Sequence, residues 1–397
     1  MAPLVVVAAM VAPAAAQTHD CELLLRDGAV VRATSMVGTA DAGFEITTDT
    51  TTRRLAAGEV IAVLGVPAAA SALPAVHLAG GDVVFGALVG GDPTGNRLEL
   101  LSPVLGPVVI TTDRLAALVP SGAAAAANVP LPAGVDEALF VRARTGFDVV
   151  AGTLHQFGEQ GVRFQPTGAD AARWYRLDEF AALRLRDGAA RDAGPGTRLL
   201  TRAGDRVLVD ALQWTRDGVR CRLEGGVETV LRASDLAAAA FAHDVVFLAD
   251  LPTTKVEESG HDGEVVHPFR RDHSVLGAPL VTAGRTAAKG FGVHARSRLT
   301  FVVPEGVARF WTRVGFDDSA LRLPLEPHVD LRVVVDDRVV FERRDYAAGG
   351  VPLDIGPLPV RSGGTVTLEV DPGRGRDLGD RINWLLPVFL PAASRRP

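Results

Sequence analysis

The chain has 397 residues, a formal net charge of −6 and only two cysteines. Its length allows two to four domains with at least one sizeable hydrophobic core. The mild acidity excludes the basic surface that nucleic-acid-binding proteins use, so no nucleic-acid partner is expected. Two cysteines cannot form a disulfide framework. A single bridge between Cys21 and Cys221 and two unpaired, half-buried side chains are both open interpretations.

The first 16 residues are similar to a secretory signal peptide. A short apolar run ends in Ala14-Ala15-Ala16, and such small residues precede a cleavage point. No Lys or Arg precedes the run, which departs from the pattern, so a start further upstream is an alternative. We predict a signal peptide over residues 1–16 and a secreted, periplasmic or cell-envelope location. No later apolar stretch reaches about 18 residues, so no membrane span is expected after cleavage.

A weak internal repeat follows the predicted signal peptide. A turn glycine precedes an apolar closing residue by 32, 34, 34 and 32 residues in the pairs Gly28 and Val60, Gly81 and Leu115, Gly146 and Phe180, and Gly204 and Leu236. Between them, apolar and polar residues alternate with the period of a half-buried strand. We predict four small antiparallel β units, SH3-like or Sm-like in size, over 17–66, 74–120, 136–187 and 197–243. Units this small bury little surface alone, so neighbouring copies are expected to pair.

The pattern changes after residue 250. Strands lengthen and aromatic residues concentrate, and the segments Val329–Val335 and Thr365–Val370 alternate apolar with polar residues. We predict a two-sheet β-sandwich over residues 251–391. The expected fold class is therefore all-β, with tandem small units followed by a sandwich.

Three motifs occur in a fixed order in this last domain. They are Gly290-x-Gly292-x-His294, the strand that runs into Gly315-Phe316-Asp317-Asp318, and Asp380-x-x-x-Trp384. The set resembles the NPCBM family of carbohydrate-binding modules over about residues 280–390. The resemblance implies a galactose-binding-like jelly-roll β-sandwich that binds sugar and accompanies glycoside hydrolases or other envelope proteins. Asn383 departs from the family, which often has an acidic residue there, and residues 321–327 are more apolar than usual.

Sugar recognition needs an aromatic face and planar polar groups that meet paired hydroxyls. The residues of suitable type at the expected loop ends are His294, Asp317, Asp318, Asn383 and Trp384. Each also has a structural interpretation, because buried polar and large aromatic residues usually serve packing. His294 could hold its own loop, the two aspartates could form a turn, and Trp384 could lie in the core.

Trp311 is a sixth candidate. Strand alternation places it with Arg309 and Arg313, on the face opposite Phe310. A Trp between two guanidinium groups suits a sugar platform or a domain contact, and packing under a neighbouring loop is the alternative.

The loop 371–380 offers the carboxylates of Asp371, Asp377 and Asp380, and oxygen ligands suit a structural calcium ion. The spacing matches no calcium-loop pattern, and Arg374 and Arg376 argue against a dense positive charge. No other cofactor is expected.

No Gly-x-Ser-x-Gly, HExxH, P-loop or dinucleotide-binding motif is present. We therefore predict an exported, non-catalytic protein that binds a glycan or polysaccharide through its last domain. The β units would act as a spacer or as an array that contacts envelope proteins. Two alternatives are a structural or interaction protein of the envelope, and a glycoside hydrolase with an unrecognised centre in 130–245, since paired carboxylates are usually far apart in a chain.

Overall fold

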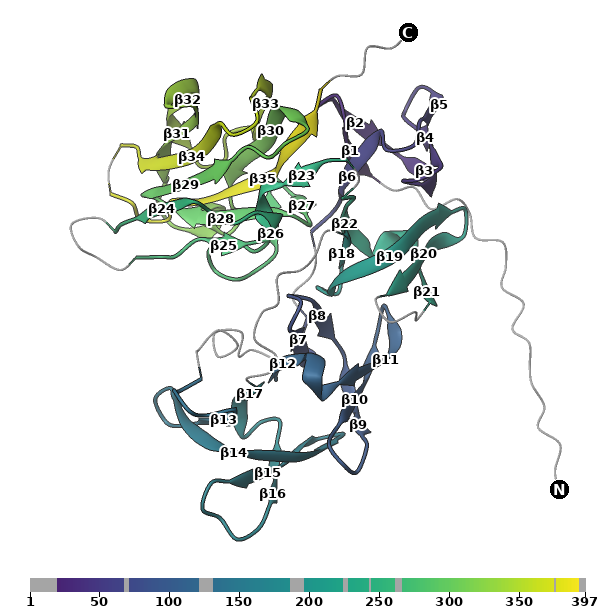
Figure 1. The fold of residues 1–397 in the computed structure, drawn as a ribbon, viewed down its shortest axis with the longest axis vertical. Coiled ribbons are helices and arrows are strands. Elements are labelled where there is room, and N and C mark those ends of the chain that lie inside the picture. Colours follow the sequence, from purple (N-terminus) through teal and green to yellow (C-terminus); the bar gives the residue numbers. More distant parts are fainter. Residues whose placement is uncertain are drawn as a thin grey trace, which may run out of the picture.

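The computed structural model describes residues 20–67, 71–120, 131–185, 196–223, 228–242, 244–260, 266–374 and 376–392. Within these ranges the chain consists of antiparallel strands and a few short 3₁₀ turns, which confirms the all-β class (Figure 1). In the same ranges no helix has the length and apolarity to cross a bilayer. The predicted signal peptide, residues 1–16, lies outside the described residues.

The first 22 strands fall into four groups, which we name units 1 to 4. Unit 1 contains β1 (Cys21–Leu25), β2 (Val30–Ala33), β3 (Ser35–Thr39), β4 (Gly43–Thr47), β5 (Thr52–Leu55) and β6 (Val60–Leu64). Unit 2 contains β7 (Ala75–Leu78), β8 (Val83–Phe85), β9 (Ala87–Gly91), β10 (Arg97–Ser102), β11 (Gly106–Thr111), the 3₁₀ turn η1 (Thr112–Arg114) and β12 (Leu115–Val119). Unit 3 contains β13 (Glu137–Arg142), β14 (Phe147–Gly158), β15 (Gly161–Pro166), β16 (Arg173–Arg176) and β17 (Phe180–Leu185). Unit 4 contains β18 (Thr197–Thr201), β19 (Arg206–Thr215), β20 (Gly218–Leu223), β21 (Glu228–Leu231), η3 (Ala233–Asp235) and β22 (Leu236–Ala240).

The four units share one topology. In each unit the last strand returns to pair with the first, as β6 does with β1, β12 with β7, β17 with β13 and β22 with β18. This closure bends a short sheet strongly, as in small β-barrels. The predicted domain limits enclose these strands, and the limits themselves stay a prediction.

The units associate in two pairs through equivalent strands. In one pair, β12 of unit 2 lies antiparallel to β17 of unit 3, with Leu118 opposite Leu183. In the other, β22 of unit 4 lies antiparallel to β6 of unit 1, with Ala239 opposite Val63. Our expectation of pairing between sequence neighbours was therefore right for units 2 and 3 and wrong for units 1 and 4. All residues of β6 and β22 are buried. A strand that is apolar on both faces must be covered on both, and the strand that covers it can come from any part of the chain.

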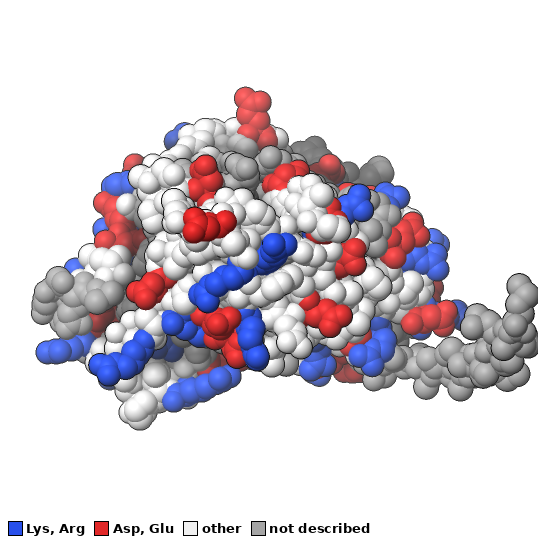
Figure 2. All heavy atoms as spheres, turned by 90° about the horizontal axis from the view of Figure 1, so that it is seen from below, with Lys and Arg blue, Asp and Glu red and all other residues white. Residues whose placement is uncertain are grey.

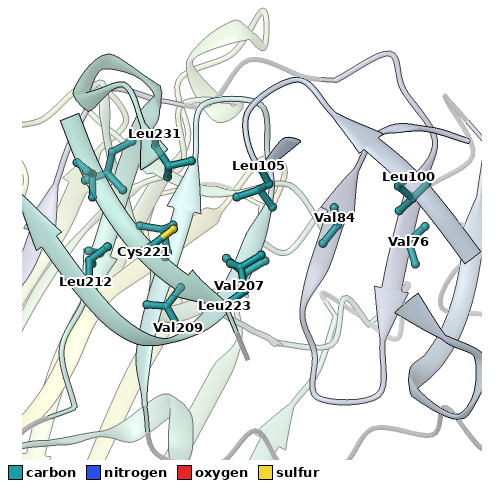
Figure 3. Close-up of a cluster of buried hydrophobic side chains, with 14 of the residues drawn as sticks. Val76, Val84, Leu100, Leu105, Val207, Val209, Leu212, Cys221, Leu223 and Leu231 are labelled. Carbon is teal, nitrogen blue, oxygen red and sulfur yellow. The ribbon is translucent and has the colours of Figure 1, made fainter. Parts of the chain in front are cut away.

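Polar contacts link units 2 and 4. The guanidinium of Arg198 in β18 forms a buried ion pair with Asp82 of unit 2, whose other oxygen accepts a hydrogen bond from Leu208 N at 3.0 Å. Asp205 accepts one from Phe85 N at 2.8 Å. A hydrophobic core extends across the same two units, and Figure 3 shows its side chains: Val76, Val84, Leu100 and Leu105 of unit 2, and Val207, Val209, Leu212, Cys221, Leu223 and Leu231 of unit 4.

Both cysteines are buried and free. The interpretation of two unpaired side chains therefore holds, and the bridge between Cys21 and Cys221 is not formed. Burial raises the pKa of the Cys21 thiol to about 12 and that of Cys221 to about 11, so neither is a thiolate at neutral pH.

The remaining strands form a two-sheet sandwich. Sheet I has the order β25-β28-β35-β30-β33, with β23 also paired to β35, and sheet II has the order β24-β29-β34-β31-β32. The strands of sheet I are β23 (Val246–Phe247), β25 (Arg270–Arg271), β28 (Gly290–His294), β30 (Val307–Phe316), β33 (Leu353–Pro359) and β35 (Arg381–Pro391). Those of sheet II are β24 (Lys255–Glu258), β29 (Ser297–Val302), β31 (His328–Val335), β32 (Arg338–Ala347) and β34 (Thr365–Pro372). A separate hairpin consists of β26 (Leu280–Thr282) and β27 (Arg285–Ala287), and two 3₁₀ turns are η4 (Leu248–Asp250) and η6 (Ala320–Arg322).

The sandwich packs on units 1 and 4 through the outer face of sheet I. A cluster of buried residues joins Leu24 and Ala62 of unit 1 and Ala237 of unit 4 to Trp311 and Leu386 of the sandwich. The hairpin β26–β27 adds a backbone hydrogen bond from Thr286 N to Gly65 O at 3.0 Å. Figure 1 shows β6 and β22 beside β27 and β23 at this junction. Because the contact is apolar and buried, the sandwich and the two units form one packed body.

Candidate functional site

The Gly-x-Gly motif allows a backbone segment to lie directly on β28. A Cβ atom on Gly292 would stand 2.4 Å from the backbone of Ser274, which no side chain tolerates. The bare glycine lets Gly292 N donate to His273 O at 2.9 Å. Gly290 N donates to the Asp272 carboxylate at 3.0 Å. The motif therefore has a structural role, because it allows the segment 272–274 to pack on the outer face of sheet I.

Asp272 then connects the sandwich to unit 4. Its carboxylate forms an ion pair with Arg206 of β19 and lies 3.8 Å from the ammonium nitrogen of Lys289. Lys289 is also paired with Asp250, and its side chain is almost fully buried. Burial alone would raise the pKa of Asp272, but the charges of Arg206 and Lys289 outweigh it and hold the pKa below its usual range. The lysine that precedes the motif thus belongs to a buried charge network at the domain junction.

Two histidines lie at the same junction. His273 Nδ1 lies 3.0 Å from Arg271 O and 3.2 Å from the guanidinium of Arg206. Burial, helped by the Arg206 charge, lowers the pKa of His273 to about 4. Burial, helped by Arg184, lowers the pKa of His77 in unit 2 to about 4 as well. Both rings are neutral at pH 7.

Trp311 lies in this junction rather than on an open face. It is only 1 % exposed, so it presents no platform to a sugar. Its strand neighbours contact unit 1 too: Arg309 donates to Arg26 O at 3.2 Å, and Arg313 pairs with Glu22. Burial alone would lower the pKa of Arg313, but its hydrogen bonds to Asp354 and Glu22 outweigh burial and raise the pKa. Of the interpretations offered for Trp311, the structure favours the domain contact.

Asp317 and Asn383 hold the sandwich together. The Asn383 amide donates to Asp317 Oδ2 at 2.7 Å and to Val281 O at 3.0 Å, and both side chains are buried. Asp317 Oδ1 accepts from Ser319 N at 2.9 Å. The pair therefore ties the hairpin β26–β27 to the ends of β30 and β35, and the hydrogen bond between Asn383 Nδ2 and Asp317 Oδ2 is buried.

Trp384 and Asp318 also have packing roles. Trp384 is fully buried between the two sheets, opposite Phe291 in the β28–β35 register. Asp318 is half-buried, and its Oδ2 accepts from Gly284 N at 3.0 Å, which fixes the turn of the hairpin. Of the six candidates, only His294 and Asp318 keep part of their surface accessible to solvent.

His294 lies at the uncovered end of sheet I. Its Nδ1 is 2.8 Å from Ala295 O, and its ring packs against the exposed ring of His267 with centroids 4.8 Å apart. Because a carbonyl oxygen only accepts, Nδ1 carries the proton and Nε2 is an acceptor while the ring is neutral. Burial lowers the pKa of His294, which favours that neutral form at pH 7.

Arg381 lies beside His294. The two residues are directly opposite in the β28–β35 register, so their side chains leave the same face of the sheet. The guanidinium of Arg381 donates to Ser319 Oγ at 3.2 Å, and both side chains are half-buried. We name His267, His294, Ser319 and Arg381 the sheet-end patch. The patch combines the guanidinium donors of Arg381, the imidazole acceptor of His294 and the hydroxyl of Ser319. These groups can form hydrogen bonds with neighbouring hydroxyls of a sugar.

Reasoning from the sequence missed three of these four residues. His267 lies in a polar stretch before the first motif, and Ser319 belongs to none of the three motifs. Arg381 stands inside the motif that ends in Trp384, and its position two residues before Asn383 on one strand face was a usable signal.

The calcium expectation does not fit the donor set. The carboxylate of Asp371 already forms ion pairs with arginines, and its Oδ2 lies 2.7 Å from Arg332 Nη1. Asp380 is fully buried without a protein partner for either carboxylate oxygen. Burial and the neighbouring Asp377 raise its pKa to about 8. Among the residues that the structure describes, no three His, Cys, Asp or Glu side chains form a group able to hold a metal ion.

The comparisons with known proteins agree with the resemblance seen in the motifs. Residues 244–390 match the family model of the NPCBM/NEW2 domain. The last domain is therefore similar to the NPCBM/NEW2 domain, and the match covers less than half of the 397 residues. A search of curated proteins found no match.

Several solved structures are similar at low identity. The CBM51 module from Clostridium perfringens GH95, in complex with methyl-galactose, is 20 % identical with a TM-score of 0.32, over 36 % of this chain and 99 % of that chain. The CBM51-2 and INT domains of Clostridium perfringens ZmpB, in complex with GlcNAc, are 20 % identical with a TM-score of 0.30, over 47 % of this chain and 41 % of that chain. The tandem CBM51 modules of a family 98 glycoside hydrolase from Streptococcus pneumoniae are 14 % identical with a TM-score of 0.30, over 93 % and 88 %. TM-scores at this level carry no argument about function.

Proposed function

We propose that the protein is an exported, non-catalytic carbohydrate-binding protein whose NPCBM/NEW2 domain binds glycan at the sheet-end patch. The observation that carries the proposal is the family match over residues 244–390, since this is a domain of carbohydrate-binding modules. The patch supports it because His267 is exposed there and His294, Ser319 and Arg381 are only half-buried, so donors and an acceptor lie together at the surface. Asp318 lies one residue before Ser319 and would border the same site.

Binding at this patch is expected to be weak. The described patch has no exposed Trp, Tyr or Phe, so it gains a few hydrogen bonds without a stacked ring. His294 must be neutral to accept a hydroxyl proton. Affinity should therefore fall as the pH drops below the ordinary histidine pKa and the imidazole becomes charged.

The test is a glycan array followed by isothermal titration of each hit with the intact chain. Arg381→Met removes the donors, and His294→Ala removes the acceptor. Each variant should weaken binding at least tenfold, roughly 1.4 kcal/mol. Arg338→Met is the matched control, because Arg338 is an exposed arginine on β32 of the other sheet. Absence of any saccharide binding at millimolar concentration would refute the proposal.

Units 1 to 4 are proposed to support the sandwich and to contact envelope proteins. Their buried junction with sheet I argues for a fixed support rather than a loose spacer. Pull-down from an envelope fraction with the intact chain, compared with a variant altered in unit 2 or 3 alone, tests the contact role. Capture that does not depend on these units would contradict it.

A second candidate function is an interaction protein that keeps the sandwich only as a fold. The observation that favours it is the burial of Trp311, Asp317, Asn383 and Trp384, which leaves most of the predicted sugar contacts inaccessible. The same glycan titration separates the two functions. Retained partner capture together with no saccharide binding would establish this second function.

A further inference from the structure

Trp174 stands apart from the other three tryptophans. Its side chain is 51 % exposed, whereas Trp214, Trp311 and Trp384 are each at most 3 % exposed. It lies on β16 of unit 3, far from the sandwich at the opposite end of the molecule (Figure 1). An indole ring left half in water costs hydrophobic free energy that burial would recover. Its position therefore calls for an explanation other than packing of the core.

The ring of Trp174 lies close to the neighbouring strand β14. A Cβ atom on Gly158 of β14 would stand 2.8 and 2.9 Å from two atoms of the six-membered ring of Trp174. Inner-face residues of the same three strands, Phe157, Val162 and Tyr175, are buried. The indole thus lies beside Gly158 on the outer face of the sheet, with about half of its side chain exposed to solvent.

Polar side chains extend this surface in a row. Arg163 on β15 is directly opposite Trp174, and Gln156 on β14 is directly opposite Arg163. Residues opposite each other in antiparallel strands share a face, with Cβ atoms about 5 Å apart. The exposed guanidinium of Arg163 has no hydrogen bond or ion pair to another described residue. Beside the row, His155 Nε2 lies 3.1 Å from Gln165 Oε1.

The charges around the row are mixed rather than strongly basic. Arg176, on the same face of β16, is neutralised by Asp178, with Nε and Oδ1 3.1 Å apart. Figure 2 views the molecule from below, the end where unit 3 lies in Figure 1, and shows acidic and basic residues interspersed over that face. A nucleic acid or strongly anionic partner would need a larger basic area.

We propose that this row, Trp174, Arg163 and Gln156, is a second glycan-binding surface, which takes one or two sugar rings of a polysaccharide chain. The exposed indole face meets the CH-rich face of a pyranose, and Arg163 and Gln156 donate to its hydroxyls. The proposal goes beyond the sandwich site and rests in part on it, because an NPCBM/NEW2 domain on the same chain makes a polysaccharide the expected partner. Two weak sites on one chain raise the apparent affinity for a long polymer far above that for a short oligosaccharide.

The test uses the intact chain and two soluble neutral polymers, a galactan and a β-glucan, with short oligosaccharides of each. Trp174→Ala should lower the apparent affinity for the bound polymer at least tenfold and leave the binding of a short oligosaccharide to the sandwich unchanged. Arg163→Met should act in the same direction. Trp174→Phe, which keeps a smaller ring, should fall between the wild type and the Ala variant.

Fluorescence reads the site directly, since Trp174 is the exposed tryptophan. Iodide should quench the wild type, and the bound polymer should protect it from quenching. Trp174→Phe should show little quenching with or without polymer. A matched control is Trp311→Phe, which changes a buried tryptophan and should leave both quenching and protection intact.

The outcomes separate this proposal from the proposed function. Loss of polymer affinity in Trp174→Ala alone supports the second surface and refutes the sandwich site. Loss in Arg381→Met alone, without protection of Trp174 from iodide, overturns the second surface and leaves the sandwich site standing. Loss in both variants supports both sites, and no saccharide binding by the wild type overturns both.

Discussion

Replacement of Asp272 by Asn tests the buried junction between the sandwich and unit 4. The amide keeps an oxygen that can accept from Gly290 N, so the backbone contact at 3.0 Å survives. The negative charge between Arg206 and Lys289 is lost, which leaves Arg206 buried without its counter-ion. Removal of one partner from a buried pair costs about 3–5 kcal/mol. Because Lys289 keeps Asp250, we expect the lower end, about 3 kcal/mol of the free energy of unfolding.

Urea unfolding followed by tryptophan fluorescence measures this change, since Trp311 lies in the same junction and reports its opening. The control is Glu257→Gln, which removes the exposed partner of Lys255 at 2.9 Å and should have no measurable effect. In a double-mutant cycle with Arg206→Met, the interaction free energy should exceed about 1 kcal/mol. If Asp272→Asn lowers the free energy of unfolding by no more than the control does, the assignment of a buried charge network to the junction is refuted.

Three further results follow from the packing. Trp311→Ala should lower the free energy of unfolding by about 3–5 kcal/mol in a urea titration, as for a fully buried tryptophan; a change below about 1 kcal/mol would mean that the junction is open. Acid should destabilise the fold between pH 6.5 and 4, by at most about 3 kcal/mol per ring, because His77 and His273, with pKa values of about 4, bind protons only after unfolding; stability that does not change over this range in the wild type would contradict it. Asp380→Asn should stabilise the chain by about 2 kcal/mol or more at pH 8 and have little effect below pH 4, since the raised pKa of about 8 keeps Asp380 protonated only in the folded state; equal stabilisation at both pH values in thermal melts would refute the shift.

The strands and the sandwich could be predicted from the sequence because their signals are local. Alternation at Val329–Val335 and Thr365–Val370 marks strands of sheet II, and the structure has β31 and β34 there. The order of the three motifs identified the last domain, as the family match over residues 244–390 shows. The all-β class follows from these same local patterns.

The packing partners could not be predicted, because they are distant in the chain. Alternation placed Trp311 correctly with Arg309 and Arg313, but nothing in the strand tells that unit 1, nearly 300 residues away, covers that face. For the same reason the pairing of unit 1 with unit 4 was missed. Residue type alone also failed for Asn383, since an amide suits a sugar hydroxyl and a buried carboxylate equally well.

A crystal of the intact chain soaked with an oligosaccharide from the glycan array tests the central claim most directly. We predict sugar density at the sheet-end patch, with hydroxyls within about 3 Å of the Arg381 guanidinium and His294 Nε2. Sugar bound elsewhere on the sandwich, with the patch left to solvent, would contradict this account.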